Sequence, residues 1–263
     1  MAKYIEMIRI RFLMMLAYRT NYYSGILIYT INIGAYYFLW TAIYGEKESI
    51  QGLSVAQMTS YVAVAWMARA FYFNNIDREI ATEIREGRVA VELIRPYNYL
   101  GMKVMQGLGE GIFRFAFFSI PGMVIVALLF SLTVTTKVDT WLFFLVSLMF
   151  SFIINTQINL ITGMMTFFLF NNDGFMYAKR VLIDLFSGLL LPISFYPLWA
   201  QDVMKFFPFQ AISYIPSMIF SEGIRGSAIW NAIFFQAVWA IVLLLPIVVM
   251  WHMARKRLIV QGG

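Results

Sequence analysis

The chain has 263 residues, of which 61% are hydrophobic and only 13% are charged. Soluble domains carry about 25% charged residues, so this composition excludes an ordinary soluble protein and predicts an integral membrane protein. Cysteine is absent and His252 is the single histidine, so we expect neither a metal site nor a catalytic centre. We attribute the net charge of +6 to loops facing an anionic membrane surface, and not to binding of nucleic acid.

Residues 1–20 predict an amphipathic helix that lies in the membrane interface. The apolar residues recur at helical spacing, at Ile5, Ile8, Phe12 and Leu16. Charged residues are scattered among them instead of preceding them, which argues against a cleavable signal peptide.

Six apolar runs predict six transmembrane helices, each of which needs about 20 residues. The runs cover residues 23–43, 55–73, 111–133, 140–170, 180–200 and 228–250. An even number of crossings places both termini on one side. Sixteen of the 20 Lys and Arg residues lie on that side, so the positive-inside rule predicts cytoplasmic termini. We expect one all-α transmembrane domain over 1–263.

Residues 192–222, before the last span, predict a re-entrant segment at the outer face. Prolines at 192, 197, 208 and 216 break this stretch into short helices. It is nevertheless too rich in Phe and Trp for a free loop, so neighbouring protein should protect it.

The cytoplasmic segment 74–106 is unusually charged, with nine charged residues among the 23 of 76–98. Ile76, Ile80 and Ile84 form one apolar stripe of a helix, and Gly87 is its predicted end. Two interpretations remain open from the pattern alone. The segment is either a solvated helix with internal ion pairs or a docking element for a cytoplasmic partner.

The fourth run carries a continuous polar stripe on one helical face. Its residues are Ser147, Ser151, Asn155, Asn159, Thr162 and Thr166. The stripe either packs against a neighbouring helix or lines a substrate route, for which the candidates are Ser151, Asn155, Asn159 and Thr162. It holds no charge, which argues against an ion pathway and suits an amphipathic or apolar substrate.

The third run begins with a glycine cluster at Gly107, Gly109 and Gly111, which predicts close helix packing and not a nucleotide loop. Glu110 and Arg114 are spaced for an ion pair that either anchors the helix end or acts as a gate. Asp184 is similarly spaced from Arg180.

The order of these elements resembles the permease subunit of type-2 ABC exporters. That family carries an I-R-x-G-R-x-x-x-x-L-x-R-P stretch after its second span, matched here by Ile84, Arg85, Gly87, Arg88, Leu93, Arg95 and Pro96. It also has a proline-punctuated re-entrant segment before the last span, like 192–222. The resemblance covers nearly the whole chain through loose motifs.

The resemblance implies that segment 74–106 contains a coupling helix for a separate ATPase. The expected coupling residues are Glu83, Arg85, Glu86, Gly87, Arg88, Arg95 and Pro96. Two ATPase copies would bind ATP and Mg²⁺, while this chain binds no cofactor. A second permease, identical or paralogous, would complete an export path for a drug, peptide, lipid or glycan across a bacterial inner membrane.

Two other classes of membrane protein fit the sequence less well. A secondary carrier or channel without an ATPase should show central charges and paired broken helices, whereas only 192–222 is broken. A membrane enzyme needs clustered His, Asp or Cys residues, and this chain supplies almost none.

Overall fold

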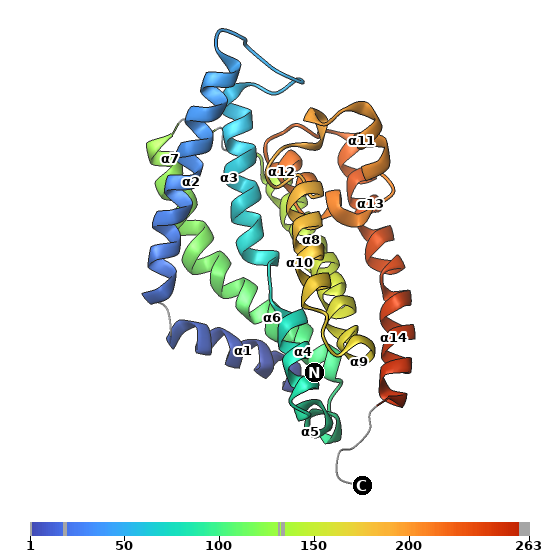
Figure 1. Cartoon of the computed structure of the whole chain (residues 1–263). Coiled ribbons are helices and arrows are strands. Elements are labelled where there is room, and N and C mark those ends of the chain that lie inside the picture. Colours follow the sequence, from blue (N-terminus) through green and yellow to red (C-terminus); the bar gives the residue numbers. More distant parts are fainter. Residues whose placement is uncertain (1, 18–19, 131, 133–134, 258–263) are drawn as a thin grey trace.

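The computed structural model describes residues 2–17, 20–130, 132 and 135–257, and every regular element in these ranges is a helix. Long helices run side by side as a bundle around α8 (Figure 1). They are α2 (Thr20–Tyr44), α3 (Val55–Tyr72), α8 (Val138–Met164), α13 (Ser227–Val242) and α14 (Leu244–Lys256). Helix α8 packs against α3, α13 and α14, which makes it the centre of the bundle.

A further long helical segment crosses the bundle obliquely and contains a π-helical bulge. It consists of α6 (Tyr99–Arg114), the π-helical turn η1 (Phe115–Ser119) and α7 (Ile120–Leu129). Pro121, at the start of α7, has no N–H and cannot continue a regular ladder. The Ile120 N–H bonds to the Phe115 carbonyl across the widened turn, which accommodates the proline without breaking the helix.

The two ends of the bundle differ. Helix α1 (Ala2–Ala17) lies across one end and packs along α6, and the short helices α4 (Ile76–Arg85) and α5 (Arg88–Ile94) lie at the same end. The loop between α2 and α3 and helix α11 (Leu198–Met204) lie at the opposite end (Figure 1). The charged segment and the N-terminal helix therefore share one end, as their cytoplasmic assignment requires.

In the described chain, four helical segments are long and apolar enough to cross a membrane. They are Ser24–Tyr44, Tyr99–Leu129, Val138–Leu169 and Ser227–Lys256. Helix α3 is not among them, and its sequence includes polar residues such as Gln57, Ser60 and Arg69. A helix enclosed by other helices can carry such groups, since it does not face lipid. The prediction of six spans thus rests on α3 and α10 in addition to these four.

Helix α10 (Asp173–Phe186) differs most from its predicted span, 180–200. It begins earlier and is only 14 residues long. Gly188 follows in the left-handed region, at φ +82°, and Pro192 prevents the helix from resuming.

Short helices follow α10, as the prolines predicted for 192–222. They are η2 (Ile193–Phe195), α11, η3 (Pro208–Ala211) and α12 (Tyr214–Phe220). Helix α12 is buried against α3 and α8. Leu198, Trp199 and Phe206, in and after α11, are instead exposed, so neighbouring helices cover only part of this segment.

Candidate functional site

The charged segment folds as two short helices joined by a glycine. Ile76 and Ile80 of α4 are buried against the bundle, as their spacing predicted. Gly87 adopts φ +72°, a conformation that costs other residues about 1 kcal/mol or more, and it ends α4 and starts α5. The glycine therefore turns the chain so that α5 forms the tip of this end of the molecule.

The tip exposes apolar side chains to the outside. Val91 is 57% exposed and Ile94 is 85% exposed, whereas Val89 is buried. Charged groups border them, with Arg88 paired to Glu86 and Arg95 to Glu92. An apolar centre with a charged rim is the usual composition of a protein–protein contact surface.

The predicted coupling residues divide into an outer and an inner group. Arg85, Glu86, Gly87, Arg88, Arg95 and Pro96 are exposed. Glu83 instead points inward, where it accepts hydrogen bonds from the Tyr99 hydroxyl at 2.5 Å and from Lys103 at 2.6 Å. Arg85 pairs with Asp173 at 2.7 Å, which ties α4 to the start of α10. Glu83 and Arg85 therefore fasten the segment to the bundle.

A buried ion network joins α1, α4 and α6. Glu110 pairs with Arg114 as its spacing predicted, and also with Arg11 of α1 at 2.9 Å. Arg11 pairs in addition with Glu79 of α4. The Glu110 side chain is only 7% exposed, so the two arginines compensate a charge that would be costly if it were unpaired.

Glycines on α6 allow this close approach. A Cβ at Gly109 would lie 2.4 Å from the Ile8 carbonyl oxygen of α1, and one at Gly111 would lie 2.5 Å from the Phe71 carbonyl oxygen. The prediction that the glycine cluster serves close packing is confirmed for these two positions.

The polar stripe of α8 is buried along its length. Asn155 donates to the Tyr72 carbonyl at 2.9 Å, and Asn159 donates to the Asn74 carbonyl at 3.0 Å. Ser151 reaches the Ala211 carbonyl at 3.3 Å, while Thr162 bonds within its own helix. These contacts satisfy backbone carbonyls where α3 ends and where η3 approaches, so the stripe packs helices together. A role in a substrate route stays a prediction.

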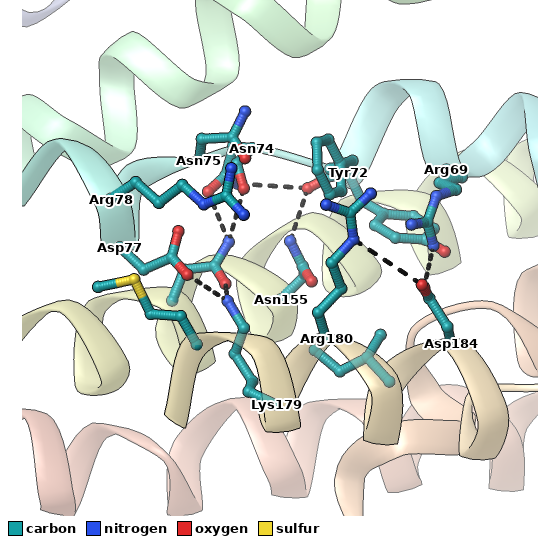
Figure 2. A pocket seen from close by; sticks show the side chains of 14 residues that line it. Arg69, Tyr72, Asn74, Asn75, Asp77, Arg78, Asn155, Lys179, Arg180 and Asp184 are labelled. Atoms are coloured by element: carbon teal, nitrogen blue, oxygen red, sulfur yellow. Dashed lines mark hydrogen bonds and ion pairs between the residues drawn. The ribbon is translucent and has the colours of Figure 1, made fainter. Parts of the chain in front are cut away.

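A hollow of about 30 Å³ lies where α3, α4, α8 and α10 meet (Figure 2). Its charged lining residues are Arg69, Asp77, Arg78, Lys179, Arg180 and Asp184. Asn74, Asn75, Asn155 and Asn159 add four amides to the lining. The hollow therefore contains more positive than negative groups.

The inner charges of this pocket are paired. Lys179 contacts Asp77 at 2.6 Å and the Asn159 amide oxygen, and Arg69 contacts Asp184 (Figure 2). Arg180, the partner expected for Asp184 from sequence, lies farther away at 4.0 Å. The predicted pair is present, but Arg69 makes the closer contact.

Three arginines surround the ring of Phe73, which links α3 to α4. The guanidinium carbons of Arg69, Arg114 and Arg180 lie 5.2, 5.7 and 5.6 Å from the ring centroid. Each is within the range of a cation–π interaction. Helices α3, α6 and α10 therefore meet at the link between the bundle and the charged segment.

Among the described residues, no group of three or more His, Cys, Asp or Glu residues could hold a metal ion.

The fold and these surfaces define a helical membrane protein with a charged, partly apolar tip at one end. A model of the ABC-2 family transporter protein matches residues 30–262. The chain therefore belongs to the ABC-2 transporter family, whose membrane domain is the permease subunit of an ABC transporter and is not itself catalytic. Membership also implies association with an ABC ATPase. No curated protein matches the sequence.

Sequence reasoning missed several residues of this end. The exposure of Val91 and Ile94 depends on which face of α5 packs inward, and seven residues are too few for the periodicity to show it. In the sequence, Lys103 and Lys179 are only two of the 20 basic residues. Their partners lie 20 and 102 positions away, a separation that no local spacing rule detects.

Proposed function

We propose that this protein is the membrane subunit of an ATP-driven exporter and that α4 and α5 dock on its ATPase. The observation that carries the proposal is the tip of α5, where Val91 and Ile94 are exposed between charged residues. Exposed apolar groups inside a polar rim favour a protein partner over solvent. The exposed members of the predicted coupling set lie around them.

The ion networks supply a path for motion from the docking tip to the bundle. Two carboxylates of α4, Glu79 and Glu83, form ion pairs with Lys103 of α6. Glu79 also pairs with Arg11 of α1, and Asp77 and Arg85 of α4 pair with residues of α10. A displacement of α4 by the ATPase would therefore shift α1, α6 and α10 together. Such a coupled shift of helices is one known way of switching between alternative states.

We further propose six membrane crossings, with α3 and α10 added to the four apolar spans, and both termini in the cytoplasm of a bacterial inner membrane. In the described part of the chain, helices pack directly around α8 and fill the interior of one copy. A second permease, identical or paralogous, and two ATPase copies that bind ATP and Mg²⁺ complete the exporter.

The substrate is an amphipathic or apolar molecule, such as a drug, peptide, lipid or glycan. The uncharged stripe of α8 supports this class, because an ion route would require charged or more strongly polar groups. A secondary carrier remains the alternative function, and the docking tip argues against it because a carrier has no ATPase to bind.

Copurification tests the docking proposal. The tagged protein is isolated in mild detergent, and nucleotide-binding subunits that come with it are identified and quantified. The variant Ile94→Asp with Arg88→Glu should lose the ATPase, because both changes oppose an apolar, charge-matched contact. The matched control, Leu198→Asp with Lys205→Glu, alters an exposed apolar and a basic residue at the opposite end.

The control should retain the ATPase. If the unaltered chain purifies without a nucleotide-binding subunit, or if the α5 variant retains it as well as the control does, the docking proposal is wrong. A self-sufficient carrier then becomes the leading interpretation.

A further inference from the structure

The charged pocket of Figure 2 has an excess of positive charge that its own residues do not neutralise. Four basic and two acidic side chains line it. The two carboxylates are engaged by Lys179 and Arg69, the inner cations. Two positive charges therefore remain, on Arg78 and Arg180.

These two arginines are the exposed cations of the pocket lining. Among the described residues, Arg78 forms no ion pair and is exposed. The Arg180 side chain is 48% exposed, and its contact with Asp184 is long, at 4.0 Å. Figure 2 shows both on the same hollow, from α4 and from α10. Planar guanidinium groups bind phosphate oxygens in pairs, which makes such an arrangement suited to a phosphate group.

The hollow has a volume of about 30 Å³, and a cavity needs roughly 10–15 Å³ to hold one water molecule. It can therefore admit an oxygen of a phosphate group whose remaining atoms contact the two exposed arginines.

An apolar hollow of about 440 Å³ opens on the next turns of α10. Apolar and aromatic side chains line it, among them Leu182, Phe186, Trp199 and Phe207. Lys179 and Phe186 are separated by roughly 10 Å along the helix axis, at 1.5 Å per residue. One molecule with a phosphate and a hydrocarbon chain can therefore contact both hollows.

We infer that the pocket between α4 and α10 binds the phosphate group of a membrane amphiphile, whose hydrocarbon chain follows α10 into the apolar hollow. This binding site goes beyond the proposed coupling to an ATPase and does not depend on it. The same phosphate chemistry is available from a soluble phosphate compound, and the experiment separates the two sources.

The test uses the full chain in neutral detergent and native mass spectrometry, which counts bound molecules. The probes are dioctanoyl phosphatidic acid, dioctanoylglycerol, which has the same chains without phosphate, and inorganic phosphate. We expect phosphatidic acid to bind in preference to dioctanoylglycerol. Arg78→Gln with Arg180→Gln should weaken its binding about tenfold or more, since the double variant removes two charge-assisted contacts to the phosphate.

Arg255→Gln with Lys256→Gln is the matched control, because it removes two exposed positive charges from the end of α14. This control should change the affinity for phosphatidic acid by less than about twofold, as expected for screened surface charges. The unfolding temperature of both variants, measured on the same samples, verifies that they are folded.

Leu182→Gln distinguishes the sources. This variant should weaken the binding of phosphatidic acid and leave the binding of inorganic phosphate unaffected. If the binding of both probes depends on the two arginines and Leu182→Gln changes the binding of neither, the phosphate site stands and its ligand is soluble. Equal binding of phosphatidic acid by the arginine variant and by its control overturns the inference, as does equal binding of dioctanoylglycerol and phosphatidic acid.

Discussion

Replacing Gly109 with alanine tests whether α1 is packed on α6 by backbone contact. The new Cβ would lie 2.4 Å from the Ile8 carbonyl oxygen, and real Cβ atoms essentially never approach closer than 3.0 Å. Helix α1 or α6 must therefore move by at least the difference, 0.6 Å. The neighbouring atoms belong to the backbone, so no side-chain rotation relieves the clash.

The magnitude follows from two opposing effects. Alanine gains about 1 kcal/mol over glycine in a helix interior. Overpacking of a well-packed contact costs about 1–3 kcal/mol. The sum places Gly109→Ala between no effect and a loss of about 2 kcal/mol. Gly101→Ala is the control on the same helix, since its Cβ would lie at 3.4 Å or more from any neighbour.

The assay is the unfolding temperature of the detergent-purified protein, followed by tryptophan fluorescence. The difference between the two variants isolates the overpacking cost, so Gly109→Ala should be less stable than Gly101→Ala by about 1–3 kcal/mol. Proteolysis within α1 should also be faster for Gly109→Ala, because the helix is displaced from its support. Equal stability and equal proteolysis of the two variants would refute the backbone contact between α1 and α6.

Three further outcomes are expected. Glu110→Gln should destabilise the protein by about 3 kcal/mol in the same unfolding assay, because it leaves Arg11 and Arg114 without their shared carboxylate. The control is Glu6→Gln, which removes an exposed ion pair and should cost less than about 1 kcal/mol. Asn155→Ala should cost about 1 kcal/mol, since it removes one of the two side-chain hydrogen bonds to the Tyr72 carbonyl, the other coming from Asn74, and an unchanged unfolding temperature would contradict that role. Hydrogen bonds from Lys137 and Thr135 lower the pKa of Glu222 from its ordinary value of 4.5, so the stability that this carboxylate contributes is present at neutral pH and is lost as the pH falls through its lowered pKa. Unfolding temperatures measured from pH 7 down to pH 3 should show that loss in the unaltered protein and less of it in Glu222→Gln.

Local patterns predicted the features that depend on neighbouring residues. Ile76 and Ile80 are buried as their spacing required, Gly87 ends α4, and Glu110 pairs with Arg114 four positions away. The prolines of 192–222 divide that segment into short helices. Each of these depends on helical periodicity or backbone conformation, which the residue types themselves impose.

Span lengths were predicted less well where tertiary contacts decide them. Helix α10 stops at Phe186, although the apolar run continues to residue 200, because the chain turns at Gly188 and the following residues pack as short helices beside it. The helix of the third span begins at Tyr99, well before its apolar run, because polar residues such as Lys103 and Glu110 are satisfied by α1 and α4.

The sequence by itself determined that this is a helical membrane protein with one highly charged segment, because composition, apolar run length and local charge density are read along the chain. Only the tertiary structure decided which charges meet. Three ion pairs join residues that lie about 100 positions apart in the sequence, namely Asp77 with Lys179, Arg69 with Asp184, and Arg11 with Glu110. Packing of α1, α4, α6 and α10 at one end brings them together, and pairing then becomes favourable because a buried charge without a partner is costly.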